Sequence, residues 1–167
     1  MSLPSKIKAS FMNGNLGIKV VRPAIADIAG WVSIFTINGG LVQVTGLYAI
    51  VTTLHAGAAC NLQFRHTTGN TILCALTGAI ASPVGTIITI TGDPADGAVI
   101  GVGTGVDNTA PPIQGGLKGS ATAGIQQMGL VCGVGDIQVD WTVVTAGVTR
   151  YVLTYIPIDD EAYVFSV

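Results

Sequence analysis

Charge is what this sequence has least of. Only 16 of its 167 residues are charged, 7 Lys or Arg and 9 Asp or Glu, which is 10% of the chain, against about 25% in an ordinary soluble domain. A compact chain of this mass exposes roughly 7,700 Å² of surface, which corresponds to an average of about 480 Å² of surface per charged residue. Because 49% of the residues are hydrophobic and the mean hydropathy is +0.63, the composition excludes a disordered chain. It indicates a folded protein whose surface is covered by lipid, by copies of itself or by another protein.

The sequence also lacks a basic excess, paired cysteines and a secretory leader. Its net charge of −2 provides no broad basic face for duplex nucleic acid. The three cysteines, Cys60, Cys74 and Cys132, include no Cys-x-x-Cys pair, which argues against a disulfide framework or a zinc finger. The first residues contain no apolar stretch of about 7–15 residues, so no signal peptide is expected. We therefore expect synthesis in a reducing cytoplasm, with the thiols buried as small hydrophobic groups.

Two long charge-free stretches raise the question of a membrane span. No charged residue lies between Asp27 and Arg65 or between Arg65 and Asp93, and each stretch exceeds the ~20 residues that cross a bilayer as a helix. An Asn-Gly-Gly run at 38–40 and a Ser-Pro pair at 82–83 interrupt them, and basic flanking residues that would orient a span are absent. The sequence therefore predicts no membrane segment.

What the sequence has in abundance is β-branched residues. Val, Ile and Thr occur 19, 18 and 18 times, together 55 of 167 residues, whereas Glu occurs once. β-branched side chains are restricted at χ1 and pack well on a pleated sheet. Apolar and polar residues alternate in several segments, and no long segment has a helical period. These patterns predict an all-β protein.

The alternation predicts individual strands and two hairpins. Residues 60–66 form a strand that a four-residue turn joins to a partner strand at 71–76. The side chains expected to share the inner face of the first strand are Cys60, Leu62, Phe64 and His66. Residues 137–143 and 150–156 are expected to pair as a second hairpin, with Tyr151, Leu153 and Tyr155 on one face. Further strands are predicted at 31–37, 41–54, 85–91 and 125–132, with a bulge or bend at Gly46.

Two segments lack sustained alternation. Residues 1–30 hold four of the seven basic residues and have the pattern of an extended arm. Residues 101–123 form a loop rich in Gly, Pro and Thr that is too long for a simple connection, and such loops commonly order against a partner. We expect both segments to contact neighbouring chains. The candidate contact residues in them are Lys6, Lys8, Phe11, Lys19, Arg22, Asp107, Pro111, Pro112 and Lys118.

The run Asp159, Asp160 and Glu161 is the densest acidic segment of the chain. Paired carboxylates can serve acid–base catalysis, but a run directly after a strand is more typical of a solvated or partner-facing turn. We therefore interpret these three residues as partner contacts that could bind the basic arm of another subunit.

The histidines and cysteines do not form a recognisable metal or catalytic set. His55, Cys60, His66 and Cys74 lie within twenty residues of one another, but zinc ligands usually come in pairs two to five residues apart. We interpret them as core thiols and a core histidine. The chain has no Gly-x-Ser-x-Gly elbow and no plausible Ser/His/Asp grouping, so we expect neither a cofactor nor an enzymatic activity.

Two segments rich in glycine and aspartate have a superficial similarity to a calcium-binding loop and to a phosphate-binding loop. Asp93 and Asp96, with Asp107 farther on, lack the alternating acidic ligands and the final Glu of an EF-hand loop. A plain turn is favoured there, with calcium at an oligomer interface as the alternative. The Gly-x-Gly-x-Gly run at 101–105 lacks the Lys-Ser/Thr pair and the helix that a phosphate-binding loop needs.

Several short motifs carry a resemblance to a known family. They are FTINGG at 35–40, VQVTGL at 42–47, VTT at 51–53, TG at 68–69, LC at 73–74, VGT at 84–86, TG at 91–92 and YVLTYIPIDDEAYV at 151–164. On these motifs the chain resembles small virion structural proteins of tailed bacteriophages and prophages. The C-terminal segment of that family looks like Trp-x-Leu-x-Tyr-x-Pro-Leu-Asp-Asp-Gly-Ala-x-Val, and this chain has Tyr151, Ile158 and Glu161 at three of those positions. Glu161 is the departure that matters, because Glu adopts φ > 0 less readily than Gly.

The resemblance implies a virion component that decorates or cements the capsid, and it brings no catalytic residues. Together with the residue patterns it predicts an all-β chain: a single-domain antiparallel β-sandwich, jelly-roll-like, over residues 31–167, after an extended N-terminal arm over residues 1–30. We expect a capsid decoration (cement) protein, made in the host cytoplasm and placed on the virion surface. Its expected partners are the major capsid protein and further copies of itself, as a trimer, with no direct nucleic-acid contact.

The alternative is a tail or baseplate module that binds host glycans. Sugar-binding sites favour exposed aromatic rings, and aromatic residues are only 6% of this chain. Trp31, Trp141 and Tyr151 fit the cores of strands better, so the sequence favours the decoration protein.

Overall fold

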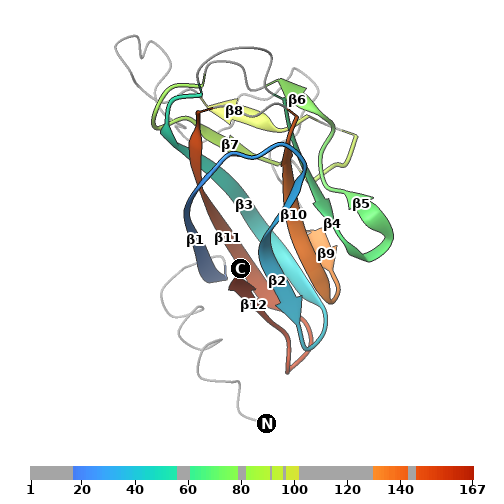
Figure 1. The fold of residues 1–167 in the computed structure, drawn as a ribbon. Coiled ribbons are helices and arrows are strands. Elements are labelled where there is room, and N and C mark those ends of the chain that lie inside the picture. Colours follow the sequence, from blue (N-terminus) through green and yellow to red (C-terminus); the bar gives the residue numbers. More distant parts are fainter. Residues whose placement is uncertain are drawn as a thin grey trace.

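The structure, a computed structural model, describes residues 17–55, 61–78, 82–90, 92–95, 97–101, 130–142 and 146–167 (Figure 1). Within them the regular structure consists of strands, apart from a single 3-10 turn, η1, at Thr68–Asn70. The strands are β1 (Ile18–Ala26), β2 (Trp31–Asn38), β3 (Val42–Thr53), β4 (Asn61–His66), β5 (Thr71–Ile72), β6 (Thr77–Gly78), β7 (Ile87–Thr89), β8 (Val99–Gly101), β9 (Leu130–Cys132), β10 (Gly135–Trp141), β11 (Val148–Pro157) and β12 (Tyr163–Ser166). No helix in this part of the chain is long and apolar enough to cross a membrane.

The strands form two antiparallel sheets. In sheet A the order is β1-β11-β3-β7-β8, and β9 pairs with the first residues of β3. In sheet B the order is β12-β2-β10-β4-β5, and β6 pairs with the first residues of β4. Figure 1 shows β1, β11 and β3 adjacent along the length of the molecule. The predicted antiparallel β-sandwich is confirmed.

The strand order is that of a jelly roll, in which a long folded-back chain wraps so that each sheet contains strands from both of its halves. The chain changes sheet at every step from β1 to β4, again between β6 and β7, and at every step from β9 to β12. Accordingly β1 pairs with β11, and β2 pairs with β10. Both sheets therefore depend on pairing between the two ends of the chain.

The predicted hairpin between residues 137–143 and 150–156 is wrong. β10 belongs to sheet B and β11 to sheet A, so the two strands face each other across the core. The indole Nε1 of Trp141 donates a hydrogen bond of 3.0 Å to the hydroxyl of Tyr151 between the two layers. Alternation along a strand reveals its buried face but not the partner strand, and for that reason the sequence pattern did not distinguish these arrangements.

The extended arm predicted over residues 1–30 is wrong for its second half, which contains a strand of the sandwich. Ile18–Ala26 forms β1, which pairs with β11 at the edge of sheet A. The register shifts between Arg22 and Ile25, around Pro23, which has no amide hydrogen for the ladder. This irregularity breaks the alternation by which strands are recognised. Residues 1–16 lie outside the described residues.

The other strand predictions are confirmed in part. β2 and β3 match the expected ranges, and the register of β3 shifts next to Gly46 as predicted, because Thr154 pairs with Gly46 and Tyr155 with Val44. β4 and β5 form the predicted hairpin, but β5 is only two residues long. β7 and β9 are shorter than the predicted strands in the residues described. β6, β8 and β12 have no counterpart among the predicted strands, and β12 follows the acidic turn and pairs with β2.

The core lies between the sheets and is built from alternate residues of the strands. Leu62, Phe64 and His66 of β4 are buried on one face, as predicted, although Cys60 lies outside the described residues. Full burial of one such apolar side chain contributes about 1.5–3 kcal/mol. The largest fully buried side chains are Trp141, Tyr151, Phe35, Phe64, Ile34, Ile37, Leu47, Leu62, Ile88, Ile90, Ile137 and Leu153.

Candidate functional site

The predicted acidic contact residues lie at one end of the sandwich, in the turn between β11 and β12 (Figure 1). This turn packs against the turn between β2 and β3. The backbone N–H of Leu41 donates to Asp159 Oδ2 at 2.7 Å, and the N–H of Ile158 donates to the carbonyl of Leu41 at 2.9 Å. The carboxylate of Asp159 therefore holds two turns of the same chain together, which is a role that sequence reasoning did not assign to it.

The Asn-Gly-Gly run at 38–40 is what allows the two turns to approach. Gly39 has φ +76°, and a Cβ there would overlap the carbonyl oxygen of Glu161. Residues other than Gly adopt such a φ at a cost, so both the backbone angle and the close contact favour glycine. Glu161 itself is exposed and has no positive φ.

Apolar side chains surround the acidic ones at this end. Leu41 is 42% exposed, Val134 is 53% exposed and Ile158 is 50% exposed, and the side chain of Leu41 lies beside the β9–β10 turn that contains Val134. Asp160 and Glu161 are exposed and have no hydrogen bond or ion pair among the described residues. We call Leu41, Val134, Ile158, Asp160 and Glu161 the acidic end.

The two predicted basic contacts in β1 point to opposite sides of sheet A. Lys19 is exposed and pairs with Thr154 of β11, whereas Arg22 is half-buried beside Tyr151. The Nε of Arg22 is buried and has no hydrogen-bond partner. The other predicted contacts lie outside the described residues and are Lys6, Lys8, Phe11, Asp107, Pro111, Pro112 and Lys118.

The outer face of sheet A carries an apolar patch among polar side chains. The outward side chains of its three long strands mix apolar and polar groups, and they are Lys19, Val21, Gln43, Thr45, Tyr48, Ile50, Thr52, Arg150, Val152, Thr154 and Ile156. Val21 is 39% exposed, and Lys19 and Arg150 are exposed as well. Lys19 and Arg150 are the charged side chains that the described strands of sheet A direct outward, and both are basic. The apolar side chains Val21, Val152 and Ile50 lie on three neighbouring strands of this face.

The outer face of sheet B carries a longer network of hydrogen-bonded side chains. The guanidinium carbon of Arg65 lies 4.1 Å from the centroid of the Trp31 ring, and Arg65 Nε donates to the Gln138 side-chain oxygen at 2.8 Å. Gln138 in turn donates to Ser33 Oγ at 3.0 Å, and Ser33 donates to Asp136 Oδ2 at 2.8 Å. This network joins β4, β10 and β2.

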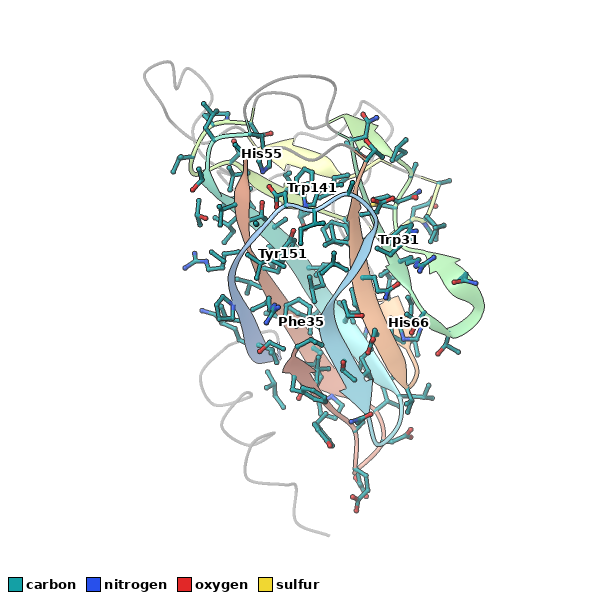
Figure 2. All side chains as sticks on the ribbon, in the orientation of Figure 1. Trp31, Phe35, His55, His66, Trp141 and Tyr151 are labelled. Atoms are coloured by element: carbon teal, nitrogen blue, oxygen red, sulfur yellow. The ribbon has the colours of Figure 1, made fainter. Side chains whose placement is uncertain are left out.

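The expectation that Trp31 belongs to the core is wrong. Trp31 is half-buried on the outer face of sheet B, whereas Trp141 and Tyr151 are fully buried. Figure 2 shows Trp31 on the opposite side of the β2–β10 region from the core residues Phe35 and Tyr151. Its ring and the Arg65 guanidinium form a fixed, partly exposed platform.

A second polar cluster is buried at the end of the sandwich opposite the acidic turn (Figure 2). His55 Nε2 lies 2.6 Å from Asp27 Oδ2 and 3.2 Å from Thr149 Oγ1. Thr149 Oγ1 donates to the same oxygen, Asp27 Oδ2, at 3.2 Å. The His55 ring also lies edge-on to Trp141, with 4.6 Å between the ring centroids. A Cβ on Gly147 would overlap the imidazole, so glycine is needed for the close approach.

The geometry of this cluster does not match a catalytic relay. In such a relay the carboxylate bonds one imidazole nitrogen and the hydroxyl bonds the other. Here Asp27 and Thr149 share Nε2, while His55 Nδ1 and Asp27 Oδ1 are buried without a hydrogen-bond partner. What the contacts of the cluster do is join the ends of neighbouring strands. The sequence analysis did not identify Asp27 as part of a polar cluster. The only feature of the sequence that sets this residue apart is an isolated charge after an apolar segment.

The buried cysteines are unreactive in this fold. Burial raises the pKa of Cys74 to about 11, although a backbone hydrogen bond from Phe64 acts in the opposite direction. Burial also raises the pKa of Cys132 to about 11. Because the thiolate is the nucleophile and the metal ligand, both groups are protonated and inert near neutral pH. This agrees with the interpretation of the thiols as small hydrophobic groups.

A cavity of about 210 Å³ lies between the β4–β5 hairpin and β9, and His66 and Cys132 line it. His66 Nε2 donates to the carbonyl of Gly133 at 3.0 Å, which fixes the ring. Among the described residues no three His, Cys, Asp or Glu side chains gather in a way that could hold a metal ion. The cavity therefore brings together one histidine and one protonated thiol.

The predicted turn at Asp93 has the expected chemistry. Asp93 Oδ1 accepts a hydrogen bond from the backbone N–H of Ala95 at 2.9 Å, which is how aspartate stabilises a turn two residues on. Asp96 and Asp107, the other residues of the alternative calcium site, lie outside the described residues.

A scan against protein-family models and searches of curated proteins and of solved structures found no match to this chain. The resemblance to virion proteins of tailed phages therefore stays an expectation based on short sequence motifs.

Proposed function

We propose that this chain is a non-enzymatic structural protein of a virion, a decoration (cement) protein that binds the major capsid protein and further copies of itself. The observation that carries the proposal is the pair of unlike surfaces on one jelly roll, the acidic end and the basic outer face of sheet A with its apolar patch. A chain with two such surfaces can contact two neighbours at once, as a protein that joins subunits of a shell must do.

The composition of the surface supports the same proposal. Twelve large hydrophobic side chains of the described residues are exposed, among them Val131 at 60% and Ile158 at 50%. A soluble monomer with few charges and many exposed apolar groups is prone to associate. On a shell, each apolar contact is weak, but the symmetry of the shell repeats it, and repeated linked contacts raise the avidity without any new type of contact.

Electron microscopy of the virion that encodes this chain tests the proposal. We expect density for the jelly roll on the outer surface of the head, and purified protein should bind heads that lack it and raise the temperature at which they release DNA. Its absence from the shell would refute the proposal. The matched variants are Ile158→Asp at the acidic end and Tyr163→Asp on β12, and the first should weaken binding more than the second.

A second candidate, a glycan-binding module of the tail or baseplate, is favoured by one observation. The platform of Trp31 and Arg65 is partly exposed, and the hydrogen bond to Gln138 fixes its orientation. Sugars bind to aromatic rings flanked by such fixed polar groups. Binding to a glycan array that Trp31→Ala abolishes and Tyr48→Ala retains would support this function, as would antibody labelling of tails rather than heads.

A further inference from the structure

Two surfaces of this chain complement each other in both polarity and charge. The acidic end presents Leu41, Val134 and Ile158 together with Asp160 and Glu161. The turns that form it, residues 38–41, 133–134 and 158–162, contain no Lys or Arg. The outer face of sheet A presents apolar side chains as well, and its outward charged groups, Lys19 and Arg150, are both basic.

The outer face of sheet B does not offer the same match. Its charged residues include both signs, with Arg65 beside Asp136 and Asp140. Asp136 accepts hydrogen bonds from Ser33 and Thr36, and Asp140 Oδ1 accepts one from the backbone of Gly30 at 2.9 Å. These carboxylates already have partners in their own chain, and they would repel the acidic end of a neighbour.

We propose that the acidic end of one copy docks on the outer face of sheet A of a second copy. Leu41 and Ile158 would cover Ile50 and Val152, while Asp160 and Glu161 would meet Lys19 and Arg150. The apolar groups supply most of the affinity, and the charges set the register and the orientation of the contact. The role of this contact on a capsid rests on the proposed function, but the contact itself is a property of the isolated chain.

The size of the sheet face lies near what such an interface needs. Three strands about 4.8 Å apart and roughly 33 Å long cover about 500 Å² in projection, and side chains add relief to that area. Stable protein interfaces begin at about 600 Å² buried per partner. In projection the face is therefore slightly below the lower limit for one such interface, and only the relief of its side chains brings it near that limit.

The contact joins different surfaces of the two copies, so it is heterologous. Each copy has one end and one face to offer, and a heterologous contact that closes on itself gives a ring. The expected trimer would be such a ring of three copies, each docked on the next, whereas a rotation that does not close would give an open filament.

Charge reversal on each surface separately, and then on both together, tests the contact. Wild-type protein should have a mass that is a multiple of 17.0 kDa in sedimentation and native mass spectrometry. Lys19→Glu with Arg150→Glu, and Asp160→Lys with Glu161→Lys, should each weaken association on the order of tenfold or more. All four substitutions in one chain should restore the wild-type assembly, because the two surfaces are again opposite in charge.

The matched control is Arg65→Glu, a charge reversal on the outer face of sheet B, which should leave the assembly unchanged. Near-ultraviolet circular dichroism reports whether each variant is folded, and Lys19→Gln with Arg150→Gln replaces the reversal if that variant does not fold. A monomeric wild type, a fourfold variant that stays dissociated, or an Arg65→Glu variant that dissociates would each overturn the contact.

These results separate the contact from the proposed function. A chain that forms the ring but does not bind heads refutes the capsid role and leaves the contact in place. A chain that decorates heads but is monomeric in solution at high concentration refutes the contact and leaves the capsid role in place.

Discussion

The imidazole of His55 and the carboxylate of Asp27 lie 2.6 Å apart, and their side chains are only 1% and 0% exposed. Asp27 follows β1, His55 follows β3, and Thr149 of the intervening strand β11 bonds to both. The backbone N–H of Asp27 also donates to the carbonyl of Gly147, just before β11, at 3.0 Å. One buried polar cluster therefore holds three adjacent strands of sheet A together at one end.

Removing one partner of this cluster should be strongly destabilising. Asp27→Ala leaves His55 and Thr149 buried without their shared acceptor, and breaking a buried pair costs about 3–5 kcal/mol. Asp27→Asn should cost less, because its amide oxygen can still accept a hydrogen bond. Urea unfolding of Asp27→Ala, His55→Ala and the double variant measures the coupling, and strictly additive losses would show that the two side chains do not stabilise each other.

Glycine at position 39 should be essential for the acidic end. Gly39→Ala combines a positive φ with an overlap onto the carbonyl of Glu161, whereas Gly30→Ala has φ +93° but no atom within 4 Å of the added Cβ. The conformational cost of about 1–2 kcal/mol is common to both variants. We expect Gly39→Ala to lose clearly more stability in thermal unfolding, and equal losses would mean that the two turns can separate freely.

Asp159 and its neighbour Asp160 should differ in their effect on stability. Asp159→Ala removes the acceptor of the Leu41 N–H, and we expect a loss of about 1 kcal/mol, because the bond is charge-assisted but exposed to solvent. Asp160→Ala removes an unpaired carboxylate and should change stability by less than about 0.5 kcal/mol. Chemical denaturation compares them directly, and a reversed order would contradict the assignment of Asp159 as the residue that joins the turns.

The buried thiols should make the fold sensitive to alkaline pH. The folded protein keeps the protons of Cys74 and Cys132 up to a pKa of about 11, whereas the unfolded chain releases them near 9.0. Above pH 9 the unfolded state binds fewer protons than the folded state, so stability falls as the pH rises from 9 to 11. Urea unfolding across this range should show a smaller fall for Cys74→Ala than for the wild type, and identical slopes would contradict the raised pKa.

Sequence patterns located most long strands of this protein but not their partners. Leu62, Phe64 and His66 alternate with polar residues, and all three are buried as expected. β1 escaped notice because the irregularity at Pro23 interrupts its alternation, and because an edge strand with one outward face has a weak pattern. The pairing of β10 and β11 was wrong because a hairpin and a crossing between sheets leave the same alternation in the sequence.

The sequence identified which charged residues are candidate contacts, but it did not show toward which side of the sheet their side chains point. The sequence identified Lys19, Arg22 and the acidic run at 159–161 as contacts between chains. The structure directs Lys19 outward and turns Arg22 toward the core side, and it engages Asp159 within its own chain. Trp31 became an outer-face residue because a bulge in β2, between its pairings with Ile137 and Gln138, lets Ile34 and Phe35 both point inward.

By itself the sequence determined that this protein is a β-sandwich with too few charges to cover its own surface. The abundance of β-branched residues and the two-residue alternation are local properties, and they act before any distant contact forms. Only the tertiary structure decided where the scarce charges lie, because the jelly roll pairs strands from opposite ends of the chain and its bulges set which side chains face outward. That arrangement places Asp160 and Glu161 at one end and Lys19 and Arg150 on one sheet face, and the proposed association depends on it.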